Sequence, residues 1–556
     1  VQKMNEMFYF CTLLNKLDLG NFKTSNVIDM NKMFTNCSKI EKLDLSSFYT
    51  PKVENMDSMF TNCSSLKTLI VKNFDTSLVT NMDYMFSNCS ALENLDLNSF
   101  NTSLITNMAE LFYNCKSLKT LIINNFDTSG VQSMKSMFYN CFSLITLDLS
   151  SFDTSKVTEM DSMFYNCNKT SSLNINHFKT SNVIYIQNMF YNCKGLKSLN
   201  LSLIDTSKVI NMTNVFKSCL NLLELYLDNF ETSKVITMKS MFDSCQKLTS
   251  LNLNSFYTPL VNDTSCMFNG CKTLFNLDLN NFNTPEVKNM NYMFSNCIQL
   301  KSLNLNSFTV TNVVTMTAMF KNCSILSSLI LNFGNSVVEN TDYMFAECPL
   351  LTSINLQNFY SSNHKNMESM FYNCIRLSSL DISKFDTTKV TTMEKMFKQC
   401  YSLTTLNLAS FKTTSALINL NEMFYNCSLL NSLNLQGFDT SGITTMSNLF
   451  YECSSLVHLE LSNFYTPNVE YLDYMFYNCN QLTSLNLTKF KTNKVKNMEY
   501  MFYQCSSIEK LDLSSFDTKN VKNMKSMFQS CSKLTSLLLS NFDIKSVENM
   551  DYMFKD

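Results

Sequence analysis

A cysteine recurs every 26 residues along almost the whole of this 556-residue chain. The series runs from Cys11 to Cys531, with one interval of 25 residues that ends at Cys348 and one of 27 residues that ends at Cys427. Cys266 lies outside it. A fixed period of about 20 to 50 residues is the signature of a solenoid or repeat array. The period therefore predicts similar coils stacked on one another, in place of the several globular domains that the length alone would suggest.

Twenty-six columns, ending on the cysteine, describe every repeat, and residues 38–63 form one complete copy. Apolar residues occupy columns 3, 6, 8, 11, 16, 19, 22, 23 and 26. Column 23 is Phe in all 22 copies, and column 11 is Phe in all but one of 21 copies, the exception being Ile204. All 36 methionines fall in columns 19 and 22. These constant columns identify the side chains that pack inside the stack.

The spacing of the apolar columns predicts the local structure. Leu-x-x-Leu-x-Leu over columns 3 to 8 is typical of a short strand with its leucines turned inward, and columns 16 to 19 predict a second extended segment. Met-Phe at columns 22 and 23 predicts one helical turn, capped by Asp or Asn at column 20, such as Asp57. Strands of neighbouring coils are expected about 4.8 Å apart, so that identical side chains form ladders. The structural ladder is expected to include Phe34, Phe60, Phe86, Phe112, Cys37, Cys63, Cys89, Cys115, Met33, Met59 and Met85.

Turns must form with little glycine or proline, since the chain has 7 Gly and 5 Pro. Ser, Asn and Asp are expected to take their place. Four of the five prolines share column 14, which predicts that the backbone N–H of this column lies outside the ladders.

The consensus Leu-x-x-Leu-x-Leu-Ser-Ser/Asn-Phe-Asp-Thr-Ser-x-Val-x-x-Met-x-x-Met-Phe-x-x-Cys resembles the 26-residue repeat of BspA-like leucine-rich-repeat surface proteins, over the entire chain. The resemblance implies a non-enzymatic extracellular module tied to adhesion or host contact. The expected fold is a repeat solenoid, mainly β with short helical turns. It is a leucine-rich-repeat-like, right-handed coil of about 21 coils with parallel strands stacked in ladders. Phe at column 11, where ordinary leucine-rich repeats carry Asn, makes a standard horseshoe less suitable.

Composition and motifs argue against catalysis and against nucleic-acid binding. The net charge is −2, so the chain lacks the excess of basic residues that is typical of nucleic-acid-binding proteins. The three histidines, His177, His364 and His458, fall in three different columns, so no pair suits a catalytic dyad or triad. His364 replaces a core valine and is expected to be a local core or turn defect. Nucleophile-elbow and phosphate-loop motifs are absent. We expect no enzymatic activity, no cofactor and no nucleic-acid partner.

The cysteine ladder has three interpretations. Buried free thiols that act as small hydrophobic side chains are the simplest. Disulfides between successive coils are sterically conceivable, although not every member of the ladder could pair. A metal site needs clustered ligands, and the C-x4-C pair of Cys266 and Cys271 has no histidine beside it. We favour free thiols and no metal, with Cys266 partly exposed.

Several surface columns allow more than one interpretation. Asp and Asn at columns 7 and 12 either collect Ca²⁺ or form a solvated face, and the mixed columns favour the latter. Thr at column 13 either binds a regular lattice such as ice or a polysaccharide, or closes a turn within its own coil. N-x-S/T sequons permit glycosylation in a surface protein. The candidate sequons are Asn36, Asn62, Asn88, Asn322 and Asn426.

Residues 1–556 are predicted to form one continuous uncapped repeat array. Val1 and Asp556 both fall inside a repeat and lack a polar cap, so we expect a segment of a longer array or ends covered by other copies. No hydrophobic stretch is long enough to insert this segment directly into a membrane.

The functional hypothesis is an extracellular or cell-surface structural and adhesive rod that binds weakly at many places. One alternative is a protomer or segment of a filament assembled end to end. Another is a specific glycan or protein recognition module, with the irregular coils at residues 333–348 and 413–420 as candidate sites. Expected partners are the chain itself or adjoining repeats, and host or environmental surface macromolecules or glycans.

Overall fold

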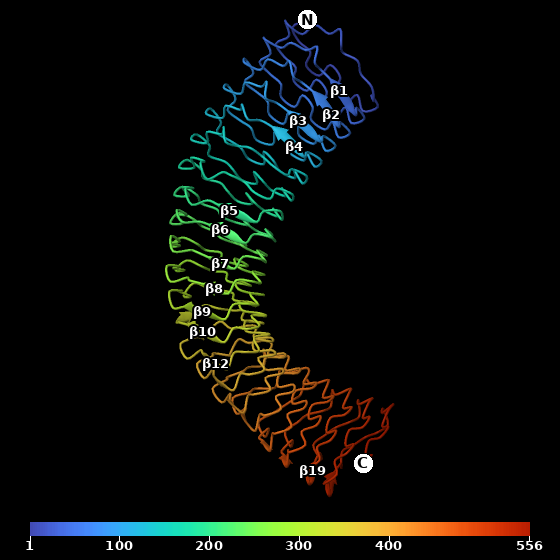
Figure 1. Cartoon of the computed structure of the whole chain (residues 1–556). Coiled ribbons are helices and arrows are strands. Elements are labelled where there is room, and N and C mark those ends of the chain that lie inside the picture. The colour runs from blue at the N-terminus through green and yellow to red at the C-terminus, as the bar shows by residue number, and fades with distance from the viewer. The chain divides into compact units, whose positions relative to one another are not determined.

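The chain winds into stacked coils, one for each repeat, in the computed structural model, which describes residues 1–556 (Figure 1). Two compact units, Val1–Asn283 and Thr284–Asp556, make up the chain, and the same coil recurs within each. The predicted solenoid with parallel, stacked strands is confirmed. The single continuous array remains a prediction.

A short strand at columns 5 to 7 forms the main ladder in most coils; residues 16–18, 146–148 and 172–174, at the same columns, form no strand. The strands pair two by two, in parallel and without any shift, as Leu43 with Leu69 shows, and Leu43 is buried between two exposed neighbours. The exceptions are β11 and β13, which pair with each other near column 13 of their coils. The first unit contains β1 (Lys42–Asp44), β2 (Thr68–Ile70), β3 (Asn94–Asp96), β4 (Thr120–Ile122), β5 (Ser198–Asn200), β6 (Glu224–Tyr226), β7 (Ser250–Leu251) and β8 (Asn276–Leu277). The second contains β9 (Ser302–Leu305), β10 (Ser328–Leu331), β11 (Asn335–Ser336), β12 (Ser353–Asn355), β13 (Tyr360–Ser361), β14 (Ser379–Asp381), β15 (Thr405–Asn407), β16 (Ser432–Asn434), β17 (His458–Leu459), β18 (Ser484–Leu485), β19 (Lys510–Asp512) and β20 (Ser536–Leu538).

A second ladder runs through column 18, within the segment predicted to be extended. It consists of single parallel pairs such as Asp29 with Asn55 and Asn55 with Asn81. The second extended segment is therefore present, but it is reduced to one paired residue in each coil.

The helical turn predicted around Met-Phe is wrong, because the chain contains no helix. Columns 21 and 25 have positive φ, as in Ser58 (54°) and Asn62 (61°). In this stretch every second N–H donates to the next coil: Ser58 to Asp83 O at 2.8 Å and Phe60 to Met85 O at 2.9 Å. The intervening N–H groups close tight turns within the coil. A helix would direct all these donors along its own axis and leave none for the neighbouring coil.

Short polar side chains close three corners of each coil. At column 7 the carboxylate of Asp44 accepts the N–H of Ser46 at 3.0 Å, and at column 12 Asp75 accepts the N–H of Ser77 at 3.1 Å. At column 18 Asn55 accepts the N–H of Asp57 at 3.0 Å, so the capping residue is at column 18 and not, as predicted, at column 20. Such Asx turns replace glycine.

The column-14 N–H meets only the side chain at column 12 of its own coil, as Ser77 shows. Proline can stand at column 14 because no bond between coils is lost there. The prediction that this N–H lies outside the ladders is confirmed.

Candidate functional surface

The side chains predicted to form the structural ladder lie inside the coils. The rings of Phe34 and Phe60 are 5.6 Å apart with planes 3° apart, and Phe60 and Phe86 follow at 5.7 Å. Phe86 and Phe112 are 5.6 Å apart. The methionines and cysteines beside them are equally inaccessible. Exposures of 2% or less are found for Met33, Met59, Met85, Cys37, Cys63, Cys89 and Cys115.

The cysteines of the ladder are free thiols, buried in every coil except those of Cys11 and Cys531, and they make a structural hydrogen bond. Cys63 Sγ donates to Phe34 O of the preceding coil at 3.2 Å, and Cys115 Sγ donates to Phe86 O at 3.2 Å. Burial raises the pKa of Cys115 to about 12, which disfavours the reactive thiolate. These thiols therefore act as packing groups that also join successive coils.

Cys266 is half-buried at column 21 with φ of 57°, as predicted for a partly exposed thiol. Cys271 lies inside the coil, where its Sγ donates to Phe242 O at 3.2 Å. The two sulfurs therefore occupy different environments. Across the chain, no group of three or more His, Cys, Asp or Glu side chains is placed to hold a metal ion.

The threonine of column 13 neither binds a lattice nor closes a turn in its own coil, so both predicted roles are wrong. Thr50 is fully buried; its hydroxyl donates to Asp75 O at 2.8 Å and accepts the N–H of Asp75 at 2.9 Å. It thus bonds to the next coil rather than closing a turn in its own, and burial removes it from any lattice. The Asp and Asn of columns 7 and 12 cap turns, and hydrogen bonds from Ser46 and Ser129 lower the pKa of Asp44 and Asp127.

The structure brings no two histidines together. His177 Nε2 lies 3.2 Å from Leu149 O, and His458 Nδ1 lies 3.5 Å from Thr483 Oγ1. His364 is fully buried in the core, 5.5 Å from the rings of both Phe359 and Phe385. Burial lowers the pKa of His364 to about 4.

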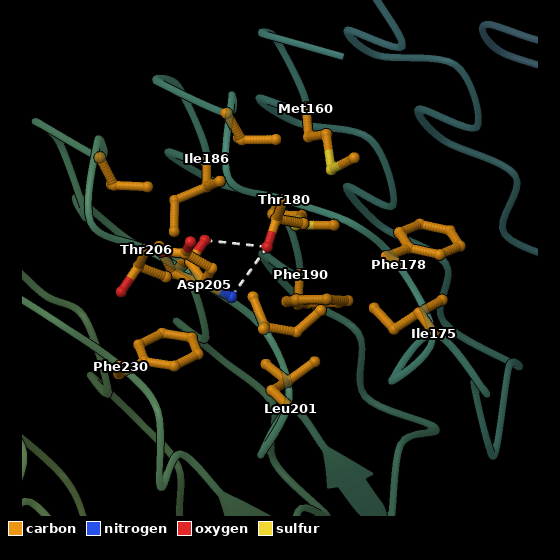
Figure 2. Close-up of a pocket in the computed structure, with 15 residues that line it drawn as sticks. Met160, Ile175, Phe178, Thr180, Ile186, Phe190, Leu201, Asp205, Thr206 and Phe230 are labelled. Atoms are coloured by element: carbon orange, nitrogen blue, oxygen red, sulfur yellow. Dashed lines mark hydrogen bonds between the residues drawn. The ribbon is translucent and has the colours of Figure 1, made fainter. Parts of the chain in front are cut away.

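A small cavity lies where Ile204 replaces the phenylalanine of column 11 (Figure 2). It has a volume of about 20 Å³ and is lined by apolar side chains that include Phe178, Leu201 and Phe230. The polar groups at its edge are already paired, since Thr180 Oγ1 donates to Asp205 O at 2.8 Å. The cavity is a packing defect, too small for an organic ligand.

Two rows of stacked tyrosines, at column 24, are the main aromatic feature outside the core. The first tyrosine row lies in the first unit, with ring separations of 4.7, 4.3 and 4.5 Å, and consists of Tyr113, Tyr139, Tyr165 and Tyr191. The second tyrosine row lies in the second unit, with separations of 4.3, 4.5 and 4.6 Å, and consists of Tyr425, Tyr451, Tyr477 and Tyr503. All eight rings are half-buried.

Two further tyrosines, from column 21, widen the second row. Tyr474 and Tyr500 stack at 4.8 Å, and they lie 5.8 Å from Tyr477 and 5.5 Å from Tyr503 respectively. Lys398 Nζ lies 4.3 Å over the ring of Tyr425. Burial, aided by Glu499, raises the pKa of Tyr474 to about 12. We call this cluster the six-tyrosine surface: Tyr425, Tyr451, Tyr474, Tyr477, Tyr500 and Tyr503.

Asparagines at column 25 form a ladder of amide hydrogen bonds beside the first row, such as Asn114 Nδ2 to Asn88 Oδ1 at 2.7 Å. All five candidate glycosylation sites belong to this column: Asn36, Asn62, Asn88, Asn322 and Asn426. Asn62 Nδ2, the atom that would carry a glycan, donates to Asn36 Oδ1 at 2.9 Å. Asn322 Nδ2 similarly donates to an asparagine of the preceding coil, while Asn426 is half-buried at the same column. Glycosylation stays a prediction.

Sequence reasoning missed the tyrosine rows. Their signal was present, because Tyr recurs at the 26-residue interval in four consecutive repeats of each row. Column 24 also holds Thr, Ser, Lys and Asp elsewhere, so over the whole chain it has the composition of a mixed surface column.

In the two coils of irregular length, hydrogen bonds near column 13 differ from those of the regular coils. At residues 333–348, β11 brings Ser336 inward, and its hydroxyl donates to Tyr360 O at 3.1 Å. At residues 413–420, Thr413 keeps its bond to the next coil, Asp439 O at 3.1 Å, while Thr414 donates to Thr388 O of the preceding coil at 3.1 Å. Recognition by these coils stays a prediction.

A family described as "Mycoplasma protein of unknown function, DUF285" matches the chain in overlapping segments: residues 1–96, 41–143, 91–199, 117–224, 186–302, 250–355, 296–411, 351–457 and 445–556. The chain belongs to this family. No curated protein matches it. The DUF285 repeats tile it from end to end, so the family accounts for every coil described above.

Solved leucine-rich-repeat structures resemble this DUF285 chain only distantly. A leucine-rich-repeat protein from Bacteroides ovatus is 21% identical, with 56% of this chain and 77% of that chain covered and a TM-score of 0.31. A leucine-rich-repeat protein of Leptospira interrogans is 15% identical over 83% and 92%, with a TM-score of 0.21. The functional domain of InlJ from Listeria monocytogenes, which includes a cysteine ladder, is 12% identical over 90% and 71%, with a TM-score of 0.20. The structure has no helix suited to crossing a bilayer.

Proposed function

We propose that this chain is a non-enzymatic, BspA-like scaffold at a cell surface, which adheres to other macromolecules through the six-tyrosine surface. The observation that supports adhesion is this cluster of non-core aromatic rings. The core phenylalanines, methionines and ladder thiols are committed to packing, and the Asx and Thr columns are committed to turns and bonds between coils. The side chains that vary between coils lie on the outer surface, and these side chains can distinguish one partner from another.

Tyrosine suits adhesion because it adds contact area and a hydroxyl at a small cost in conformational entropy. In this cluster the rings are already ordered by stacking, with Tyr451 and Tyr477 4.5 Å apart. A partner therefore meets a preorganised surface, which lowers the entropy lost on binding. Weak contacts repeated along a solenoid add up by avidity.

The charges beside the cluster favour a neutral glycan as partner. Burial raises the pKa of Tyr474 and of Tyr451, and carboxylates add to both shifts: Glu499 and Asp473 for Tyr474, and Glu452 for Tyr451. Lys398 and Lys525 lie over Tyr425 and Tyr500, so the cluster carries charges of both signs. A sulfated or sialylated chain would meet repulsion from the carboxylates beside any attraction to these lysines. A neutral glycan can pair its hydroxyls with the tyrosine hydroxyls without that penalty.

Binding to arrays of neutral and acidic glycans, and to intact host cells, tests the proposal. The test variant carries Tyr451→Thr, Tyr477→Thr, Tyr474→Ser and Tyr500→Ser, which are residues that the chain itself uses at these columns. Thr occurs at column 24 in Thr35 and Thr61, and Ser occurs at column 21 with positive φ in Ser162 and Ser526. We expect neutral-glycan binding to fall by about tenfold or more.

The matched control carries Tyr139→Thr and Tyr165→Thr in the first tyrosine row, which lacks the second column of rings. Binding should be retained in this control. Equal binding by the test variant and the natural chain would reject the six-tyrosine surface. Loss of binding on replacing residues 333–348 with a regular coil would favour the alternative site.

Surface location and self-association are separate parts of the proposal. Antibody labelling of intact cells tests the location. End-to-end association of copies stays a prediction, which sedimentation velocity at increasing concentration measures directly.

A further inference from the structure

The tyrosine rows place oxidisable rings in line along the stack of coils. Tyr139 and Tyr165 are 4.3 Å apart with planes 10° apart, and Tyr165 and Tyr191 are 4.5 Å apart with planes 2° apart. These separations are shorter than those of the buried phenylalanine ladder, where Phe138 and Phe164 are 5.6 Å apart. Since neighbouring tyrosines occupy the same column and their rings are nearly parallel, the carbons next to their hydroxyls face one another.

We propose that the two tyrosine rows are sites of oxidative cross-linking, in which a peroxidase with hydrogen peroxide joins neighbouring rings of successive coils as dityrosine. The product is a covalent bond along a stack that is otherwise held by hydrogen bonds, packing and surface ion pairs such as Lys67 with Glu41. This inference is independent of what the surface binds.

The reaction balances without any group from the protein other than the two phenols. Each phenol loses one electron and one proton and becomes a phenoxyl radical. The two radicals join through the carbons next to their oxygens, and each coupled ring moves its remaining ring proton to its oxygen as it regains aromaticity. Two electrons and two protons have then left the rings, and they reduce one hydrogen peroxide to two waters. The rings must turn toward a common edge to couple, which half-buried side chains can do.

The oxidisable side chains that flank the tyrosine rows inside the coils are not accessible in this way, although Met7, Met550 and Cys266 elsewhere in the chain are exposed or half-buried. The ladder thiols, such as Cys141 and Cys167, and the core methionines, such as Met137 and Met163, are 1% exposed or less. An enzymatic oxidant reaches the outer surface and meets the tyrosines first. The buried phenylalanines lack the hydroxyl that makes one-electron oxidation easy.

Isolated tyrosines provide a comparison within the same chain. Tyr49 is 56% exposed, Tyr257 is 54% exposed and Tyr465 is 47% exposed, all at column 12. The residues at this column in the coils on either side are not tyrosines. These three rings meet oxidant more readily than the rows do, but they lack a partner one coil away. Proximity and exposure therefore predict opposite patterns of cross-linking.

The test treats the dilute, purified full chain with a peroxidase and hydrogen peroxide, and locates dityrosine by fluorescence and by mass spectrometry of linked peptides. We expect links between neighbours of each row, at a yield per tyrosine about tenfold or more above that of the isolated rings, because the row raises the effective concentration of each partner. The links should be intramolecular and independent of protein concentration.

The decisive variant is Tyr139→Phe with Tyr191→Phe. It leaves Tyr113 and Tyr165 without a phenolic neighbour in the row, while phenylalanine preserves the stacking and hence the fold. Links in the first row should fall to background, and links in the second row serve as the internal positive control. A second variant, Tyr49→Phe with Tyr257→Phe, should change neither row. Persistent first-row links in the decisive variant, or links mainly among the isolated tyrosines, would overturn the proposal.

Discussion

The two phenylalanine ladders differ in how strictly they are maintained. At column 23, within each unit, the rings stay 5.4 to 5.7 Å apart with planes at most 13° apart. At column 11 the stacked rings of the first unit are 6.1 to 6.4 Å apart, and Ile204 interrupts them. In the second unit the column-11 planes turn by 58° between Phe333 and Phe359 and by 86° between Phe359 and Phe385.

The backbone explains the difference. The N–H of column 23 donates to the next coil, as do those of columns 19, 21 and 25, so Phe60 is tied to Met85 O at 2.9 Å. The N–H of column 11 closes a turn within its own coil, Phe48 to Leu45 O at 2.9 Å. A change of length at column 11 therefore leaves intact the bonds between coils that columns 19 to 25 make.

The 25-residue coil shows the consequence. Its column-23 rings remain regular, with Phe320 and Phe345 5.5 Å apart and Phe345 and Phe371 5.6 Å apart, although the column-11 rings nearby are tilted. Columns 19 to 25 thus keep successive coils in register, while the backbone around column 11 changes where a coil is shorter or longer than 26 residues.

Removing a column-23 ring should have the largest effect. Phe164→Ala should lower the free energy of unfolding by about 3–5 kcal/mol, because its pocket cannot close while hydrogen bonds hold both neighbouring coils. Phe152→Ala, at column 11 of the same coil, should cost less. Urea unfolding measures both costs, and hydrogen exchange should place the damage in adjacent coils, since solenoid energetics are nearest-neighbour. Equal costs would show that the two ladders do not differ in rigidity.

Low pH should have the second-largest effect on stability, through His364, which packs against the tilted column-11 rings of Phe359 and Phe385. The pKa of His364 is lowered to about 4 by burial, with Asp386 opposing the shift, whereas an unfolded histidine has a pKa of about 6.5. Between these values the unfolded chain binds the proton and the folded chain does not, so stability falls as the pH drops from 6.5 to 4. The loss should approach about 3 kcal/mol.

His364→Val, which restores the usual residue of column 16, is the control for that pH effect. Unfolding free energies at pH 7 and near pH 4 should differ less in this variant than in the natural chain. The same pH dependence in both would assign the acid sensitivity to carboxylates elsewhere.

Loss of one hydroxyl between coils ranks third. Thr50→Val removes both the donor to Asp75 O and the acceptor for Asp75 N–H, and should cost about 2 kcal/mol. The exposed Thr80 makes a weaker bond, 3.3 Å to Glu54 O, so Thr80→Val should have little effect. Thermal melting of the two variants compares them. A neutral Thr50→Val would mean that water replaces the lost hydroxyl.

Filling the column-11 defect should have the smallest effect. Ile204→Phe restores the ladder between Phe178 and Phe230 and occupies the cavity of about 20 Å³. At about 24 cal/mol per Å³, the gain is about 0.5 kcal/mol, with a similar amount from ring stacking. A decrease in melting temperature would show that the backbone around Ile204 has adapted to the smaller side chain.

Much of the interior was predictable because each fixed column recurs in every repeat. The parallel, in-register strands follow from the constant period, and the apolar columns follow from alternation, as Leu43 and Leu45 show by their burial. The turn after Met56 was not predictable, since Met-x-x-Met-Phe-x-x-Cys also fits one turn of a helix. The choice depended on acceptors in the next coil, such as Asp83 O, which the pattern of a single repeat does not contain.

The candidate surface was also predictable only in part: the recurrence of its residues is visible in the sequence, and their arrangement is not. Tyr451, Tyr477 and Tyr503 were visible at the repeat interval, yet their half-buried, stacked arrangement depends on how closely coils approach at column 24. The partner of Thr50 was equally hidden, because it lies 25 residues ahead in another coil.

By itself, then, the sequence determined that the chain is a stack with a period of 26 residues and which side chains face inward, because burial selects apolar residues at the same column each time. Tertiary structure alone decided how each turn is built and where each polar group bonds. A backbone or hydroxyl group chooses between a partner in its own coil and one in the next, and that choice exists only once the coils are stacked.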